Sequence, residues 1–148
     1  MQVSKFKDNI SGPHIDVFNT SRSVSPAIGK TILLIDDEPM VTDICELMLR
    51  ELGHNVIKAH SGQEGLRLYE ANSDNIDLII SDFNMPVMNG QEVVECLRLK
   101  GHRVKVLLCS GGLSAGEENS AASKGFNGFL RKPYNMDTLS KKIAESLN

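Results

Sequence analysis

The chain has 148 residues, of which 41% are hydrophobic, and a formal net charge of −3 at pH 7. This length fits one domain with a full core, and the mildly acidic balance argues against nucleic acid as a partner. The three cysteines form no CxxC pair, which predicts reduced core thiols in a cytoplasmic protein rather than a disulfide framework. No stretch is long and apolar enough to predict a membrane span.

Residues 1–29 differ from the rest of the chain in composition. They are rich in Ser and Asn, and Ser11-Gly12-Pro13 and Ser25-Pro26 interrupt any regular pattern. We therefore expect a flexible N-terminal tail or linker over residues 1–29, followed by one folded domain over residues 30–148.

From Lys30 onward, short apolar runs alternate with amphipathic segments. The runs are rich in Ile, Val and Leu and predict five strands, over residues 31–36, 55–59, 76–82, 104–109 and 126–130. Apolar runs without polar alternation are typical of strands that are buried on both faces of a parallel sheet. Five alternations of strand and helix therefore predict an α/β, doubly wound sandwich.

The helices between these strands are indicated by spacing and by end signals. The first has one apolar face and ends at Gly53, and that face consists of Val41, Cys45, Met48, Leu49 and Leu52. The second begins at Ser61, and Glu64 stands where a capping box requires an acid. The remaining helices are expected from Val93 to Gly101, over residues 115–123 and over residues 135–147.

Acids, a hydroxyl and a lysine stand where the predicted strands meet the loops that follow them. Asp36 and Asp37 follow the first strand, Asp82 ends the third, and Ser110 and Lys132 follow the fourth and fifth. Ligands of doubly wound sheets gather outside the carboxyl ends of the strands, so we expect these side chains to converge. Three carboxylates beside a lysine and a hydroxyl predict a Mg²⁺ site that handles a phosphoryl group.

These residues and their order resemble the receiver domain of bacterial two-component response regulators. The resemblance rests on Asp36-Asp37, on Asp82 followed by MPVMNG, on Ser110 and on Lys132-Pro133, and it extends from Lys30 to Asn148. It implies a flavodoxin-like (βα)5 sandwich whose five parallel strands have the order 2-1-3-4-5.

The resemblance also implies a role for each site residue. Asp82 corresponds to the phosphoacceptor. Mg²⁺ would be held by Asp36, Asp37, Asp82 and the backbone carbonyl of Asn84, with Asp36 acting through water. Lys132 would contact a phosphoryl oxygen, and its bond to Pro133 is expected to be cis.

Two residues are implied to transmit the phosphorylated state. Ser110 would donate a hydrogen bond to the phosphoryl group, and Phe129 would change its packing, although it replaces the tyrosine of many family members. A downstream protein is expected to bind the face formed by residues 115–123, 126–130 and 135–147. The phosphoryl donor is expected to be a histidine kinase or a histidine phosphotransfer protein, with neither nucleic acid nor membrane as a partner.

The leading interpretation is a stand-alone phosphoacceptor that is not an enzyme, beyond slow self-dephosphorylation. One alternative is a receiver module of a hybrid histidine kinase, with residues 1–29 as its linker. A more distant alternative is an aspartyl-phosphate phosphatase of the haloacid dehalogenase type. Those enzymes typically have a second aspartate two residues after the nucleophile, where this chain has Asn84, which cannot transfer protons. A module that binds partners without phosphorylation is disfavoured by the intact acidic cluster.

Overall fold

The computed structural model describes residues 29–122 and 124–148, and the expected tail over residues 1–29 lies outside the described part except for Gly29. Strands and helices alternate along the chain. The strands are β1 (Thr31–Ile35), β2 (Asn55–Ala59), β3 (Leu78–Asp82), β4 (Lys105–Ser110) and β5 (Gly128–Arg131). The helices are α2 (Pro39–Glu51), α3 (Gly62–Ala71), α4 (Gly90–Leu99), α5 (Ala115–Ala122) and α6 (Met136–Leu147).

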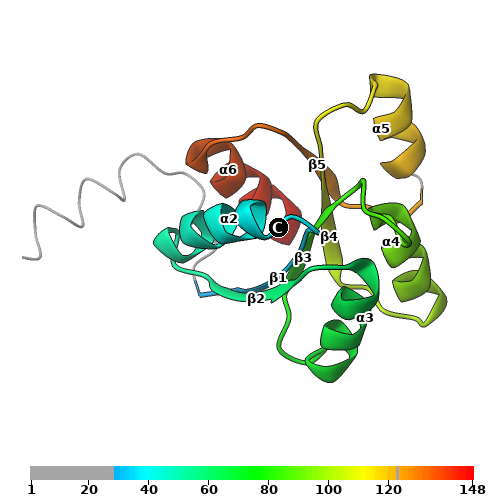
Figure 1. The fold of residues 1–148 in the computed structure, drawn as a ribbon, viewed down its shortest axis with the longest axis horizontal. Coiled ribbons are helices and arrows are strands. Elements are labelled where there is room, and N and C mark those ends of the chain that lie inside the picture. The colour runs from blue at the N-terminus through cyan, green and yellow to red at the C-terminus, as the bar shows by residue number, and fades with distance from the viewer. Residues whose placement is uncertain (1–28, 123) are drawn as a thin grey trace, which may run out of the picture.

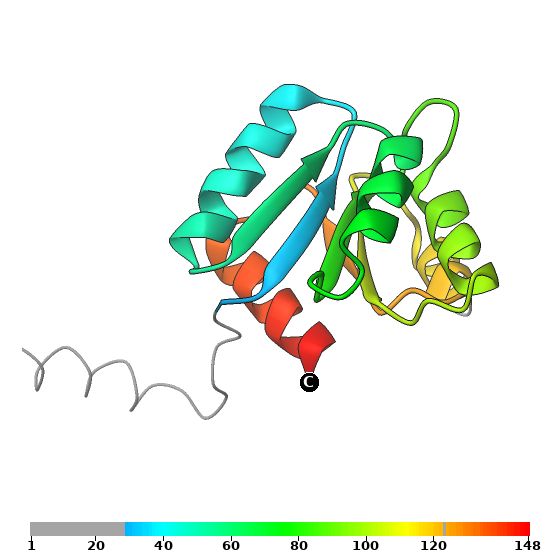
Figure 2. The ribbon, with the colours of Figure 1, turned by 90° about the horizontal axis from the view of Figure 1, so that it is seen from below.

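The five strands form one parallel sheet in the order β2-β1-β3-β4-β5, as the sequence predicts. Helices α2 and α6 cover one face of the sheet, and α3, α4 and α5 lie on the other side (Figure 1). Figure 2 shows the strand arrows of the sheet pointing the same way. All carboxyl ends therefore lie at one edge, which is where this type of fold places its ligand site.

The central strands are buried on both faces, which explains their uninterrupted apolar sequences. Ile32, Leu34 and Ile80 face a cluster that includes Cys45 and Leu49 of α2. On the other face, strand side chains pack against the apolar sides of α3 and α4, in a cluster that includes Leu33, Ile35, Ile79, Tyr69, Val93, Val94 and Leu97. The sheet is thus a fixed platform beneath its carboxyl edge.

Side-chain caps define the starts of several helices, whereas α2 begins at Pro39 without a side-chain cap hydrogen bond. The Ser61 hydroxyl accepts a hydrogen bond from the Glu64 amide at 3.0 Å, as predicted. The Glu64 carboxylate, however, accepts from the amide of His60 and not from that of Ser61, so the predicted reciprocal box is displaced by one residue. A complete capping box occurs instead at α4, between Asn89 and Glu92.

Helix α5 differs from the others in having almost no apolar character. None of its side chains over residues 115–120 is buried, and the nearest buried apolar residue is Leu113 in the preceding loop. Among the described helices, none combines the length and the hydropathy required to cross a bilayer.

Candidate functional site

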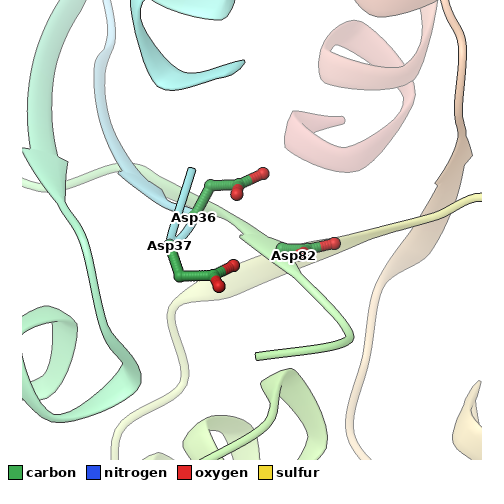
Figure 3. A group of neighbouring side chains, drawn as sticks. All are labelled: Asp36, Asp37 and Asp82. Carbon is green, nitrogen blue, oxygen red and sulfur yellow. The ribbon is translucent and has the colours of Figure 1, made fainter. Parts of the chain in front are cut away.

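Three carboxylates meet at the carboxyl edge of the sheet. Asp36 and Asp37 follow β1, and Asp82 ends β3, which is the neighbour of β1 in the sheet. One carboxylate oxygen from each of the three residues lies within 4.8 Å of the others (Figure 3). Carboxylates repel one another at this spacing, so a nearby cation would stabilise their charged form.

The cation in the described structure is the side chain of Lys132. Its Nζ lies 3.2 Å from Oδ2 of Asp36 and 3.1 Å from Oδ1 of Asp82. The Lys132 amide donates to the carbonyl of Ser110 at 2.9 Å, which continues the pairing of β5 with β4 by one residue. The Lys132–Pro133 peptide is cis, as predicted.

Burial sets the electrostatics of this cluster. Asp36 and Asp82 are only 3% and 8% exposed, so both carboxylates are largely removed from water. Burial raises the pKa of Asp82, Lys132 partly offsets this effect, and the charges of Asp36 and Asp37 raise the pKa further. Burial alone would lower the pKa of Lys132, but Asp82 and Asp36 outweigh that effect and raise it. The lysine therefore stays charged and compensates the acids.

The polar neighbourhood fixes Asp36 more firmly than the sequence indicates. Its Oδ1 accepts a hydrogen bond from the amide of Glu38 at 3.0 Å, and its Oδ2 faces Lys132. Both oxygens of this buried carboxylate are therefore engaged, which holds it in one orientation.

The other predicted residues lie around this centre. Ser110 ends β4, is 6% exposed, and its Oγ accepts from the amide of Gly112 at 3.3 Å. Asn84 is exposed two residues after Asp82, and its carbonyl as a metal ligand stays a prediction. Phe129 is half-buried and packs against the α3 and α4 side of the core, 6.1 Å from Phe126 between ring centroids. The structure therefore places Phe129 against the edge of the core rather than among the acids.

The loop after Asp82 is shaped by two residues whose conformation the sequence analysis did not explain. Val87 has φ of 69°, and the Met88 amide donates to the Pro86 carbonyl at 2.7 Å, which makes a γ-turn. A Cβ on Gly90 would lie 2.5 Å from the backbone oxygen of Asp82. Only glycine lets the start of α4 approach the acidic residue this closely.

An apolar pocket adjoins the site on the side of α2. It has a volume of about 420 Å³ and is lined by Val41, Ile44, Cys45, Met48, Lys132, Pro133 and Tyr134. The Tyr134 hydroxyl donates to the sulfur of Cys45 at 3.1 Å in this region. Met40, Ile44 and Leu47 of α2 are 75%, 57% and 69% exposed. Their spacing of four and three residues forms an outward stripe that an analysis of the buried face alone overlooked.

Comparison with known proteins finds similar sequences and structures over most of the chain. The model of the response regulator receiver domain matches residues 32–144. The cell cycle response regulator CtrA of Brucella abortus is 34% identical over 117 residues, which are 76% of this chain and 47% of CtrA. The transcriptional regulatory protein GlrR of Escherichia coli is 32% identical over 116 residues, which are 78% of this chain and 26% of GlrR.

The chain thus spans between about a quarter and a half of the length of these curated relatives. Among solved structures, the chemotaxis protein CheY4 of Vibrio cholerae is 30% identical with a TM-score of 0.75, over 80% of this chain and 99% of CheY4. A receiver domain from Clostridium thermocellum has a TM-score of 0.76 at 29% identity, over 80% of this chain and 94% of that one. The chain belongs to the response regulator receiver domain family, whose members are phosphoacceptors in two-component signal transduction.

Proposed function

We propose that Asp82 is the residue that accepts the phosphoryl group. The observation that carries this proposal is the Lys132 ammonium between Asp36 and Asp82, beside the third carboxylate of Asp37. A buried carboxylate with a fixed cation is suited to receive a group with several negative oxygens, because the cation offsets the added charge.

The transfer itself forms one bond and breaks one. An oxygen of Asp82 attacks the phosphorus of a phosphohistidine in line, and the phosphorus–nitrogen bond breaks. The electron pair of that bond returns to the imidazole, which takes up a proton from water, and Asp82 becomes an acyl phosphate. Lys132 neutralises charge on the phosphoryl oxygens throughout.

The carboxylates fit Mg²⁺ as the resident cation. Asp36, Asp37 and Asp82 supply hard oxygen donors that lie close together, and such donors suit a small divalent ion that keeps several waters. When bound, Mg²⁺ would neutralise negative charge at the carboxylates and at the phosphoryl group. We include the Asn84 carbonyl in the ligand set on the basis of the family resemblance.

The phosphorylated chain would be a regulatory state and not an intermediate of multiple-turnover catalysis. Asn84 stands where a haloacid dehalogenase-type phosphatase would have its acid–base residue, which favours a stoichiometric phosphoacceptor with slow self-dephosphorylation. Gly111 and Gly112 follow Ser110 and carry no side chain that could shield the acyl phosphate. Ser110 would sense the phosphoryl group, and Phe129 would adjust its packing in response.

The donor would be a histidine kinase or a histidine phosphotransfer protein. It has to reach Asp82 from the carboxyl edge of the sheet, where the apolar pocket shares Lys132 with the site. The outward stripe of α2 continues this pocket, so it offers the donor an apolar contact. Replacing Ile44 with Asp should slow transfer from a kinase that labels the wild type, while labelling by acetyl phosphate stays unchanged. Equal rates from that kinase would contradict this docking face.

The receiving protein would bind the face formed by α5, β5 and α6, and the chain would act in the cytoplasm. Residues 30–148 would be the receiver unit, either in a stand-alone regulator or within a hybrid kinase. This assignment rests on the family and on the polar surface of α5, the helix that follows Ser110.

The phosphoacceptor is tested with acetyl phosphate and Mg²⁺, followed by intact mass. Wild type should gain one phosphoryl group and Asp82→Ala none. Asp74→Ala, which removes an exposed acid outside the cluster, is the matched control and should be labelled like wild type. Equal labelling of Asp82→Ala and wild type would remove Asp82 from its role.

A second variant tests whether Lys132 acts on the phosphoryl group or on Mg²⁺ binding. Lys132→Ala should weaken the response to phosphorylation more than it weakens Mg²⁺ binding, because the ammonium would contact the phosphoryl group and not the metal. Titration with Mg²⁺ alone and amide exchange after phosphorylation give the two measurements. A larger loss of Mg²⁺ affinity than of response would contradict the assigned role.

A further inference from the structure

Helix α5 follows Ser110, which would sense the phosphoryl group, and its described side chains provide little apolar anchoring. Its side chains over residues 115–120 are exposed, except for that of Glu118, which is half-buried. A helix with so little buried apolar area depends on polar contacts for its position. The described contacts that tie α5 and its preceding loop to the sheet therefore indicate how this helix is controlled.

One side chain makes two of these contacts. The Arg131 guanidinium donates from one terminal nitrogen to the backbone carbonyl of Leu113 at 3.3 Å. Its other terminal nitrogen forms an ion pair with the Glu118 carboxylate. The same planar group thus bridges the loop before α5 and the helix itself. The single ammonium group of a lysine lacks this forked arrangement of donors and could not reproduce the geometry.

The position of Arg131 in the sheet connects it to the proposed site. It is the last residue of β5 and the register partner of Ser110 on β4. The amide of the next residue, Lys132, donates to the Ser110 carbonyl, and its ammonium group forms an ion pair with Asp82. Neighbouring residues on a strand point in opposite directions, so one peptide unit separates the group that holds α5 from the group that faces the acids.

Ser110 is linked to the same loop from the other side. Its hydroxyl oxygen accepts from the amide of Gly112, one residue before Leu113. A hydroxyl can donate and accept at once, so donation alone would not break this bond. If the Ser110 side chain rotates toward a phosphoryl group, however, its Oγ moves away from the Gly112 amide and the loop is free to shift. The Leu113 carbonyl would then move relative to the guanidinium of Arg131.

We propose that Arg131 is a positioning residue that holds α5 in its unphosphorylated arrangement through Leu113 and Glu118. This inference rests on the proposed phosphoacceptor function. Contacts that exist in one of two states bias the equilibrium toward that state. Removing them therefore favours the phosphorylated arrangement, and by linkage a chain biased in this way takes up the phosphoryl group more readily.

The primary test is Arg131→Gln, which keeps a polar side chain but removes the charge and the fork. Glu118→Gln tests the partner, and the double variant tests whether both act through one contact. Arg67→Gln is the matched control, because Arg67 is an exposed arginine that pairs with Glu64 at 3.7 Å on α3, away from α5. Arg131→Lys tests whether charge alone is sufficient.

The first readout is amide exchange of the unphosphorylated chain, which does not depend on phosphorylation. Residues 113–120 should exchange faster in Arg131→Gln and in Glu118→Gln, no faster in the double variant than in Arg131→Gln, and unchanged in Arg67→Gln. Unchanged exchange in Arg131→Gln would overturn the proposal, whether or not the chain accepts phosphate.

The second readout separates positioning from mere stability. The initial rate of labelling by acetyl phosphate should rise about fivefold in Arg131→Gln, because the rate follows the population of the arrangement that accepts the phosphoryl group. The Mg²⁺ affinity should stay unchanged, and the labelling rate of Arg131→Lys should lie between those of the wild type and Arg131→Gln. Faster exchange without faster labelling would reduce Arg131 to a structural contact and overturn its regulatory role. If wild type itself took no label, the phosphoacceptor function would fail, and with it the role of Arg131 in switching. The exchange data would still decide whether Arg131 holds α5.

Discussion

Helices α2 and α5 both begin just beyond site residues, yet they are held in different ways. Helix α2 follows Asp36 and Asp37 and buries Thr42, Cys45 and Leu49 against the sheet. Helix α5 follows Ser110 and buries none of its side chains over residues 115–120. Core packing therefore holds α2, whereas the described contacts of α5 with the sheet include the two polar contacts of Arg131.

This difference matches what the proposed function requires of each side of the site. The acids must keep their spacing before and after a phosphoryl group arrives, so the element that follows them should not move. A helix that reports phosphorylation needs two arrangements of similar free energy. Sparse burial provides that similarity, because few apolar contacts are lost when the helix shifts.

The largest expected effect is in local stability. Amides of α2 should exchange only when the whole domain unfolds, whereas amides of α5 should exchange through local opening. Since domains of this size unfold with roughly 5–15 kcal/mol, protection factors in the two helices should differ on the order of a thousandfold or more. Native-state amide exchange on the unphosphorylated chain measures this directly. Equal protection would show that α5 has an anchor other than Arg131 and Leu113.

The next effect concerns two leucines on the same helix. Leu49→Ala should lower the free energy of unfolding by about 2–5 kcal/mol, because it leaves a cavity in the core. Leu47→Ala should change it by less than about 0.5 kcal/mol, because Leu47 is 69% exposed whereas Leu49 is fully buried. Urea unfolding of both variants gives the comparison. Similar losses for the two would mean that the outward face of α2 is covered in solution.

The fold was predictable because its signals are local and repeated. Apolar runs such as 78–82 have a composition that suits strands buried on both faces, and the order of the sheet followed from the family resemblance. The span 55–59 was predicted correctly for β2. Several other strand ends were displaced by one or two residues, as at β5, where the predicted span 126–130 became Gly128–Arg131. Hydrogen bonding to the neighbouring strand sets these ends, and the sequence of a single strand carries little of that information.

The part of the site that depends only on where the strands end was predictable from the sequence. Asp36, Asp37, Asp82 and Lys132 converge because parallel strands end at one edge. The burial of Asp82 and the two contacts of Arg131 were not predicted. Arg131 reads as an ordinary exposed charge, and only the packing of the loop after β4 places a carbonyl and a carboxylate within its reach.

A smaller effect is expected in the pH dependence of the unfolding free energy, through a histidine buried just beyond the end of α2. His54 follows this helix, is 6% exposed, and its Nδ1 is buried without a hydrogen-bond partner in the described structure. Burial, and secondarily the charge of Lys30, lowers its pKa. The unfolded chain then binds the proton more readily than the folded one. The stability contribution is complete above the unfolded-state pKa of about 6.5 and is lost as pH falls below it.

Every tenfold reduction in the proton affinity of His54 is worth about 1.4 kcal/mol of this pH-dependent stability. Replacing His54 with Gln should therefore flatten the fall in unfolding free energy below about pH 6.5. His60→Gln is the control, because His60 is exposed. Chemical unfolding at several pH values measures the slope, and an unchanged slope in His54→Gln would assign the acid sensitivity to other groups.

The smallest expected effect is that of removing a surface ion pair from α2, and it is compared with the removal of the Arg131 pair from α5. Lys58 Nζ lies 3.0 Å from Asp43 and 2.8 Å from Glu46 of α2, so this helix also carries a surface ion-pair network. Exposed pairs contribute little when other contacts already fix both partners. Because buried Cys45 and Leu49 hold α2, Lys58→Gln should leave both the urea midpoint and the exchange of α2 unchanged within error. Arg131→Gln, which removes a comparable surface pair, should instead raise exchange in residues 113–120, because α5 has no such packing beneath its described side chains. A clear loss of α2 protection in Lys58→Gln would show that the ion pairs, and not the core, keep α2 in place.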